Sequence, residues 1–591
     1  MNNYSESVPP QDQRPNLIGM VLIVGLLFII LLVRLFHLQI NTSDNYVRES
    51  EENRITQKRV KAPRGLILDR HNRVLVRNRP FYTVSLATTT EERYKKIKQA
   101  FITSTGDTSV DGKYDKKIRN IRLKRDVDFR TVSIVEERLR SQWPSLSIET
   151  EAQRYYPFGK SAAHLLGYMG LYKSDSNENY VIGDFIGKTG LEKLHESSLR
   201  GFDGVRYFEI DASGHVRREF TKRLQAPKPG QDLKLTIDIE LQRRIESFLP
   251  DSLAGAIVVI DVRNGAILAM ANHPTFDPNI FVSFQSQDDR VKVLNSETTL
   301  LNRAIRGRYP PGSTLKMIGA IAALETGVTD TLTTFAACVG SLQVGDVIFR
   351  CNLRSGHGEL NLMSALETSC NTYFQHLAQF ISIEKWRLWA DKFGIGQPTG
   401  FQFTPKEVAG LLPSRDYYQK NGGWTVGHLL NMIIGQGAIL VTPLQMARFV
   451  SAIANGGYLV TPHISGATPP KKEIEGLTKN TLNIIRDAML RVVYGENGTG
   501  KRATTEYLSV AGKTGTAQVP NRINENNDAW FVGFSPFHEP EIAVAVVVEG
   551  GGGGGRIAAP IAQKVFTNYH QLNNKLTMHN NYKQTISPKQ E

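Results

Sequence analysis

The sequence has 591 residues, of which 41% are hydrophobic, 22% charged and 9% aromatic. This composition is that of a globular protein, and it excludes a mainly disordered, collagenous or fibrous chain. There are 71 lysine and arginine residues against 57 aspartate and glutamate residues, so the formal charge of +14 requires an anionic partner, nucleic acid or a lipid surface, to be considered. The three cysteines are an odd number confined to residues 338–370, which excludes a disulfide scaffold.

An apolar stretch near the N-terminus predicts a transmembrane helix. Residues 17–36 contain a single charge, Arg34, close to the end where its side chain can reach the membrane interface. A cleaved signal peptide is the alternative, but its apolar core would be only about 7 to 15 residues long and would precede a small-x-small cleavage site, which residues 35–44 lack. We expect a cytoplasmic head at residues 1–16, a single anchor at residues 17–37, and the rest of the chain outside the cytoplasmic membrane.

Residues 41–230 predict a first domain of short strands and charged helices. Residues 81–90 are strand-like, residues 119–143 predict a basic helical stretch with breaks, and residues 204–220 predict a β-hairpin that turns at Asp211–Gly214. Two prolines and a glycine within residues 225–232 predict a linker, so we place the domain boundary at residue 230.

The second domain, residues 231–569, opens with a hairpin pattern. Residues 254–262 and 266–274 are apolar and flank an Asn264-Gly265 turn, which strongly favours a tight hairpin. Strands are also predicted near the end of this domain, at residues 510–519, 529–534 and 541–549, with a long region of helical periodicity in between. We therefore expect one sheet assembled from distant segments. Residues 570–591 lack an apolar period and predict a disordered tail.

Ser313 and Lys316 are candidate catalytic residues because of their position and spacing. The preceding Pro310-Pro311-Gly312 places Ser313 at a helix N-terminus, where free backbone N–H groups and the helix dipole favour developing negative charge. A spacing of three puts Lys316 over Ser313 on one helix face. Serine needs a base within hydrogen-bond distance, and a lysine with a lowered pKa can act as that base. Alone, the pattern is equally typical of an N-cap serine beside a solvated lysine.

Two further motifs follow in the required order. Ser369-Cys370-Asn371 lies between two helical segments, and Lys513-Thr514-Gly515-Thr516 lies in a predicted strand. With Ser313 and Lys316 they form the S-x-x-K, S-D-N and K-T-G signature of class A β-lactamases and penicillin-binding proteins, with cysteine replacing the middle aspartate. A hydroxyl can relay a proton, an amide can orient substrate, and a strand edge with a lysine can receive an anionic peptide terminus. An earlier Lys188-Thr189-Gly190 runs into a helical pattern and has the wrong glycine spacing for a phosphate loop, so we assign it neither role.

The chain resembles the class B penicillin-binding proteins, the monofunctional D,D-transpeptidases of bacterial wall synthesis. The resemblance covers nearly everything from the anchor to residue 569, and residues 187–220 with the region before Ser369 favour the elongation branch over the division branch. Further landmarks of the family are residues 64–70, 187–201, 301–316, 435–447 and 556–566. The resemblance implies an α+β multidomain fold with one transmembrane helix, an elongated α/β pedestal of the dimerisation type, and a transpeptidase domain whose antiparallel sheet is flanked by helices.

The resemblance also implies the reaction. Ser313 would attack the penultimate D-Ala carbonyl of a donor pentapeptide, expel D-Ala and form an acyl-enzyme, which the amine of a neighbouring stem peptide resolves into a cross-link. Lys316 would be the base, Ser369 and Lys513 would relay the proton to the leaving amine, and Asn371 would orient the donor amide. On the strand around Gly515, Thr514 and Thr516 would hold the terminal carboxylate, and the N–H groups of Ser313 and Thr516 would form the oxyanion hole. β-Lactams would acylate Ser313 in the same way.

Partners and location follow from the same resemblance. No glycosyltransferase region is visible, so glycan polymerisation would belong to a SEDS-family polymerase that contacts the anchor and pedestal, together with other proteins of the elongation complex. The chain would sit in the bacterial cytoplasmic (inner) membrane with most of its length in the periplasm. Catalysis would need no cofactor, and a D-Ala-D-Ala carboxypeptidase side activity is implied.

Cys338, Cys351, His357 and Cys370 form a candidate metal site. Three thiolates and an imidazole are a usual structural zinc set, although the spacing is not the tight C-x₂-C type. A Cys338–Cys351 disulfide with a buried Cys370, or three unrelated buried thiols, are the alternatives. Elongation-type relatives can carry a metal in this loop. Zinc bound here would clamp the loop to Cys370, between Ser369 and Asn371, and so support the active site.

Other functions fit the sequence less well. Nucleic-acid binding would account for the basic charge, but an exported, anchored chain without a stacked aromatic pattern disfavours it. A β-lactamase would share the three motifs without needing an anchor or a pedestal. A β-lactam sensor needs a cytoplasmic signalling region, which residues 1–16 are too short to supply. A non-enzymatic scaffold, or a division-type transpeptidase, remains as an alternative.

Overall fold

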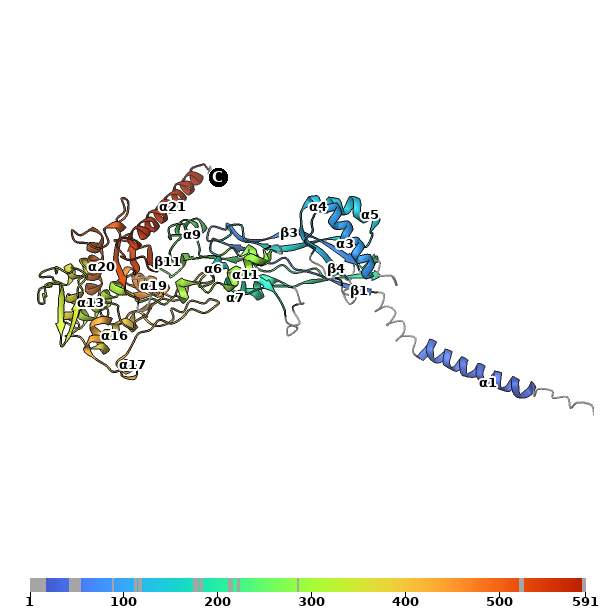
Figure 1. The fold of residues 1–591 in the computed structure, drawn as a ribbon, viewed down its shortest axis with the longest axis horizontal. Helices are drawn as coiled ribbons and strands as arrows, with labels where there is room; N and C mark the ends of the chain where they lie inside the picture. The colour runs from blue at the N-terminus through green and yellow to red at the C-terminus, as the bar shows by residue number, and fades with distance from the viewer. Residues whose placement is uncertain are drawn as a thin grey trace, which may run out of the picture. The chain divides into compact units, whose positions relative to one another are not determined.

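The computed structural model describes residues 17–41, 55–87, 90–110, 114, 120–173, 180, 184–210, 216–220, 224–283, 286–519 and 526–586. The chain divides into two compact units. Figure 1 labels their helices and strands. The first contains residues 1–63 and 201–229, and the second contains residues 64–200 and 230–591. Each unit has sheets of its own.

The first unit contains the apolar helix. α1 (Leu17–Phe36) continues as a short π-helix, His37–Asn41, and Ile18–Ile40 is the one span among the described residues that is long and apolar enough to cross a membrane. An antiparallel sheet is formed by β1 (Ile55–Val60), β8 (Gly204–Ile210) and β9 (Val216–Glu219). The β8–β9 pair confirms the predicted hairpin. Its turn, Asp211–Gly214, and the head at residues 1–16 lie outside the described residues.

In the second unit, residues 64–200 are organised around the long strand β3 (Val74–Ala87). β3 pairs antiparallel with three strands: β2 (Ile67–Leu68), β4 (Asn120–Val127) and β5 (Leu146–Tyr155). β10 (Leu233–Lys234) extends this sheet in parallel with β2. α3 (Glu91–Thr105) packs its buried face, Tyr94, Ile97 and Phe101, into a core shared with β3 and β4.

The prediction of a helical stretch over residues 119–143 is wrong in its first part. β4 occupies Asn120–Val127, and helical structure begins only at α4 (Phe129–Ile134), where the Asp128 side chain accepts a hydrogen bond from the Thr131 N–H at 2.8 Å. A π-helix (Val135–Leu139) and α5 (Arg140–Gln142) follow. Ile121 and Leu123 enter the core two residues apart, which is the period of a strand. Basic residues of the same strand, Arg122, Lys124 and Arg125, masked that period.

Short elements follow between residues 163 and 200. They are α6 (Ala163–Leu166), β6 (Met169–Leu171), β7 (Phe185–Gly187), α7 (Gly190–Leu194) and α8 (Glu196–Arg200). The fully buried Glu192 of α7 accepts hydrogen bonds from Arg64 at 2.8 Å and from Arg154 at 2.6 Å. Two family landmarks, residues 64–70 and 187–201, therefore meet in one ion-pair network, and Lys188 belongs to a strand-to-helix turn beside it.

The part of the second unit from residue 230 onward contains a five-stranded antiparallel sheet in the order β12-β11-β19-β18-β17. Its strands are β11 (Gly255–Asp261), β12 (Ile267–His273), β17 (Ala511–Ala517), β18 (Asp528–Ser535) and β19 (Ile542–Val548). Gly265, with φ +82°, provides the turn of the β11–β12 hairpin. The sheet confirms the prediction that strands from both ends of this region pair with one another.

Helices cover both faces of this sheet. In β19, Val544 and Val546 enter the core that contains α9 (Ile239–Glu246) and α21 (Ala558–Ile586), whereas Ala545 and Val547 enter the core that contains α13 (Lys316–Glu325) and α19 (Pro443–Ala454). Because both faces are buried, β19 is apolar at every position rather than at alternate ones.

The remaining elements of this part connect the layers. They are α10 (Asn279–Val282), α11 (Gln287–Asn295), α12 (Arg303–Arg306), η4 (Gly312–Leu315), β13 (Ser341–Val344), β14 (Val347–Arg350), α14 (Leu362–Glu367), α15 (Asn371–Leu377), α16 (Ile383–Lys392), α17 (Arg415–Lys420), α18 (Val426–Met432), β15 (Tyr458–Leu459), β16 (Lys472–Glu473), α20 (Lys479–Tyr494) and η5 (Lys501–Ala503). The disordered tail predicted at residues 570–591 is wrong over residues 570–586, where α21 continues to Ile586. Residues 561–586 contain no glycine or proline, the two residue types that most disfavour a helix. The helix therefore continues through this segment although the segment has no apolar period.

Candidate active site

Ser313 lies on a tight turn at the start of α13. The 3₁₀ turn η4 (Gly312–Leu315) precedes the helix, and the Lys316 N–H donates to the Ser313 carbonyl. Gly312 has φ +55°, and its N–H donates to the Gly435 carbonyl at 2.9 Å. The Thr314 hydroxyl donates to the Pro311 carbonyl at 2.7 Å and closes the turn. Ser313 is half-buried at the N-terminal end of a helix whose other residues form the core.

Lys316 is fully buried and points toward the second motif. Its Nζ donates to the Ser369 carbonyl at 2.5 Å and to Asn371 Oδ1 at 2.7 Å, and it lies 3.3 Å from Ser369 Oγ. Burial lowers the pKa of Lys316 to about 8, although the nearby Cys370 and Cys351 sulfurs favour its charged form. Ser313 Oγ makes no hydrogen bond within the described part of the chain. The expected hydrogen bond between Ser313 Oγ and the Lys316 amine is therefore absent here.

Ser369 occupies the turn between α14 and α15. Its φ of +56° lies in the left-handed region, which is uncommon for a residue other than glycine. The Ser369 N–H donates to the Leu366 carbonyl at 3.2 Å, and the Cys370 N–H donates to the Ala365 carbonyl at 2.9 Å, so the turn folds back on α14. This strained conformation directs both the Ser369 carbonyl and its hydroxyl toward Lys316.

Lys513 reaches the same serine from β17. Its Nζ lies 2.9 Å from Ser369 Oγ and 3.1 Å from the Thr514 carbonyl. The lysine is fully buried, and burial together with the nearby Lys316 holds the pKa of Lys513 well below its usual value. Two amines from distant segments therefore approach one hydroxyl, an arrangement suited to moving protons.

β17 packs directly against the Ser313 turn. A Cβ on Gly515 would lie 2.9 Å from Thr314 Cγ2 and 3.0 Å from the Pro311 carbonyl, so only glycine permits this contact. A Cβ on Gly312 would lie 3.3 Å from the Thr516 backbone nitrogen. The three predicted motifs, which span residues 313–516, thus meet at one place.

Two contacts at the KTG strand are not predicted from the sequence. Thr499 Oγ1 lies 2.7 Å from Thr514 Oγ1, and the Gly554 N–H donates to Thr516 Oγ1 at 3.3 Å. Both contacts involve the threonine hydroxyls assigned to carboxylate binding. No sequence motif marks Thr499 as a neighbour of Thr514, because their contact depends on how α20 packs beside β17.

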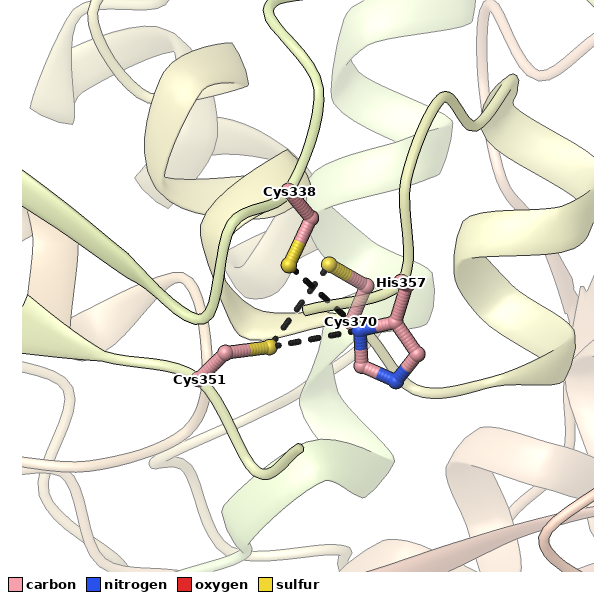
Figure 2. Close-up of side chains that lie close together, drawn as sticks. All are labelled: Cys338, Cys351, His357 and Cys370. Atoms are coloured by element: carbon pink, nitrogen blue, oxygen red, sulfur yellow. Dashed lines mark hydrogen bonds between the residues drawn. The ribbon is translucent and has the colours of Figure 1, made fainter. Parts of the chain in front are cut away.

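Cys338, Cys351, His357 and Cys370 converge beside the active site (Figure 2). Their ligand atoms all lie within 4.8 Å of one another, and the three cysteines are buried free thiols. His357 Nδ1 lies 3.5 Å from the sulfurs of both Cys338 and Cys351, and the Cys351 and Cys370 sulfurs are 3.7 Å apart. The Asn371 N–H donates to Cys351 Sγ at 3.3 Å, which joins this cluster to the motif that Lys316 contacts.

Two family models match the chain. The penicillin-binding protein dimerisation domain matches residues 59–235, and the penicillin-binding protein transpeptidase domain matches residues 255–567. The chain is 33% identical to the peptidoglycan D,D-transpeptidase MrdA of Haemophilus influenzae, over 97% of this chain and 93% of the relative.

Solved structures agree with this relationship. Penicillin-binding protein 2 (PBP2) of Helicobacter pylori, in its complex with MreC, superposes with a TM-score of 0.77 at 28% identity, covering 88% of this chain and 99% of that one. A chain from a peptidoglycan synthase complex that coordinates polymerization and crosslinking gives a TM-score of 0.73 at 30% identity, covering 94% and 98%. The chain therefore belongs to the class B penicillin-binding proteins, and within them to the PBP2 type.

Proposed function

We propose that this protein is the serine-type peptidoglycan D,D-transpeptidase of cell elongation, and that Ser313 forms the acyl-enzyme. The observation that carries the proposal is the approach of Lys316 and Lys513 to Ser369 Oγ, at 3.3 and 2.9 Å, beside a Ser313 turn that touches β17. The substrate is a stem peptide ending in D-Ala-D-Ala, and β-lactams acylate the same serine.

Lys316 is suited to be the base for acylation. Ser369 O and Asn371 Oδ1 only accept hydrogen bonds, so they can take both hydrogens of a neutral amine and leave its lone pair for a proton. The lowered pKa makes that neutral form accessible near neutral pH. The Ser313 hydroxyl meets this lone pair when substrate closes the site, since catalytic hydrogen bonds are often long without substrate.

The remaining motif residues complete the reaction. Ser369 and Lys513 pass the proton to the leaving D-Ala amine, and Asn371 orients the donor amide. The backbone N–H groups of Ser313 and Thr516 stabilise the tetrahedral oxyanion, while Thr514 and Thr516 hold the terminal carboxylate of the donor. When water replaces the acceptor amine, the same acyl-enzyme gives a carboxypeptidase side reaction.

Covalent labelling tests this assignment. Fluorescent penicillin is expected to attach to the wild type, Ser313→Ala is expected to abolish labelling, and the wild type should release D-Ala from a pentapeptide-bearing glycan. Ser414→Ala, which removes the N-cap hydroxyl of α17, is the control and should still label. Labelling that disappears only when another serine is replaced would refute the proposal.

The anchor and pedestal define the setting of the reaction. α1 anchors the chain in the cytoplasmic (inner) membrane, and residues 38–591 face the periplasm, where the wall peptides are. The PBP2 structures with MreC and in a synthase complex support elongation-complex partners, among them a SEDS-family polymerase that supplies the glycan.

Structural zinc at Cys338, Cys351, His357 and Cys370 is the second part of the proposal. In a tetrahedral site with ordinary zinc bond lengths, sulfurs lie about 3.8 Å apart and sulfur and nitrogen about 3.5 Å apart. The Cys351 and Cys370 sulfurs are 3.7 Å apart, and His357 Nδ1 lies 3.5 Å from the Cys338 and Cys351 sulfurs. All four ligand atoms lie within 4.8 Å of one another, so these residues fit the ion. Zinc would fix β14 and the loop around His357 to Cys370 and so hold Ser369 and Asn371 in place; it takes no part in catalysis.

Metal analysis decides the zinc proposal. Protein purified without chelator is expected to contain about one zinc per chain, and His357→Ala to lose most of it, because a closed site needs four ligands. His376→Ala, on the neighbouring helix α15, is the control and should retain the metal. A mapped Cys338–Cys351 disulfide in the native protein would rule zinc out.

A further inference from the structure

A buried network joins the end of β19 to the segment before Ser313. Glu549, which follows β19, accepts a hydrogen bond from Arg303 Nε at 2.8 Å and another from the Tyr309 hydroxyl at 2.8 Å. Both hydrogen bonds end on the same carboxylate oxygen, Oε1. Arg303 and Tyr309 are almost completely buried, whereas the Glu549 side chain is 25% exposed. Glu549 is 246 positions from Arg303 and 240 positions from Tyr309 in the sequence.

Trp530 holds the next residue of the same segment. Its indole Nε1 donates to the Pro310 carbonyl at 3.0 Å, and its ring meets the Tyr309 ring edge-on with centroids 6.0 Å apart. The Tyr309 backbone also pairs with Val441, at 2.9 Å in both directions. The side chain of Glu549, after β19, therefore holds Tyr309, and the side chain of Trp530, in β18, holds Pro310.

This anchoring lies only a few residues before the nucleophile. Pro311 and Gly312 are the residues between the anchored pair and Ser313, and Gly312 is the residue that approaches the Thr516 nitrogen. A movement of Tyr309 would therefore change the spacing between the Ser313 N–H and the Thr516 N–H. Displacements of about 1 Å at a reacting centre can lower a rate about 100-fold.

We propose that Tyr309 is a positioning residue, whose hydrogen bond to Glu549 sets the place of the Ser313 turn relative to β17. This role rests on the proposed function, because it concerns the oxyanion hole of the Ser313 reaction. Glu549 provides the acceptor, and Arg303 keeps the carboxylate oriented toward Tyr309. Phenylalanine at position 309 would fill the same space against Trp530 and lose only the hydroxyl.

The same strand supplies a matched control at its other end. Glu541, just before β19, accepts a hydrogen bond from the Tyr569 hydroxyl at 2.9 Å, and Tyr569 is 7% exposed. The two tyrosine–glutamate pairs thus share residue types, bond length and burial. Tyr569 belongs to α21 and does not contact the Ser313 turn through any hydrogen bond of the described residues.

The test compares Tyr309→Phe with Tyr569→Phe in the full chain. Benzylpenicillin acylation is measured over a concentration range, which separates the limiting acylation rate from the apparent dissociation constant of the first complex. Tyr309→Phe is expected to lower the limiting rate about 10-fold and leave the dissociation constant within about 2-fold, because the reacting groups move while the binding surface stays. Tyr569→Phe should leave both constants unchanged, although both variants lower the melting temperature by similar amounts.

Trp530→Phe provides a second, independent variant. It keeps an aromatic ring but removes the hydrogen bond to Pro310, so the limiting rate should fall again without a change in the dissociation constant. Equal acylation constants for Tyr309→Phe and Tyr569→Phe, or a loss confined to the dissociation constant, would overturn the positioning role. A wild type that does not acylate at Ser313 would remove the proposed function, and the role of Tyr309 with it.

Discussion

Two buried lysines at one serine hydroxyl are the central chemical feature of this site. Burial disfavours the charged form of both lysines, and the nearby Lys316 further lowers the pKa of Lys513. Both side chains reach Ser369 through hydrogen bonds that a neutral amine can make. Burial therefore makes the neutral, basic form of these amines more accessible than it is for lysines in water.

Acylation should depend on pH through Lys316. The amine must be unprotonated to accept the Ser313 proton, and its neutral fraction grows as the pH rises through its pKa of about 8. The rate of penicillin acylation should therefore rise from about pH 6.5 and level off above about pH 9. Stopped-flow measurements at constant ionic strength, corrected for the folded fraction at each pH, test this. A rate that is flat or that falls with pH would exclude Lys316 as the base.

At the scale of single residues, the sequence predicts which side chains form the candidate site better than it predicts the contacts between distant side chains. Ser313, Lys316, Ser369, Asn371 and Lys513 could be predicted because they match three short sequence motifs, and the structure brings these motifs together. The left-handed backbone of Ser369 and the pairing of Tyr309 with Glu549 could not, because both depend on packing between segments far apart in the sequence.

At the scale of elements, the contact between β17 and η4 decides whether the site assembles. Gly515→Ala would place a methyl group 2.9 Å from both Thr314 Cγ2 and Trp530 Cβ, so the strand and the turn must separate. We expect a stability loss of about 1–3 kcal/mol and a marked fall in acylation. Urea unfolding and penicillin labelling measure the two effects.

Gly553→Ala is the control for that substitution. The nearest atom to its added methyl group is 4.0 Å away, and Gly553 is not among the glycines with positive φ. Stability should change by no more than about 0.5 kcal/mol and labelling should persist. Equal effects of the two alanine substitutions would contradict the close packing of β17 on η4.

Elements with a clear period were predictable, and elements with a mixed pattern were not. The β11–β12 hairpin could be identified because an Asn-Gly turn separates two apolar runs, and the Val-rich β19 because both of its faces are buried. β4 was missed because Arg122, Lys124 and Arg125 stand among its core residues, and the helical extent of α21 was missed because its outer turns lack an apolar face.

At the scale of the whole molecule, α1 should be dispensable for the chemistry. The membrane span buries no part of itself against the protein, and all motif residues belong to the second unit. A chain lacking residues 1–41 should therefore purify without detergent and bind penicillin at the wild-type rate. A chain ending at residue 557 is the contrasting control, because it loses Ala558, Ala562 and Phe566 from the core, and it should aggregate. A need for detergent in the first variant would contradict the prediction.

The sequence predicts which distant segments share the catalytic sheet, but not their order within it. Strand order depends on which edges meet, and that information is spread over contacts between residues nearly 300 positions apart. The division into two units could not be predicted from the sequence either. Residues 201–229 follow the second unit's residues 64–200 in the chain but belong to the first unit, where β8 pairs with β1.

The position of β19 has a consequence for biosynthesis. β11 and β12 emerge first, but their neighbour in the sheet is β19, and β17 joins only through β18 and β19. A chain under synthesis therefore carries an open apolar edge on β11 until residues 542–548 have been made. Such a precursor has no complete sheet, so it cannot react with penicillin before its synthesis is nearly finished.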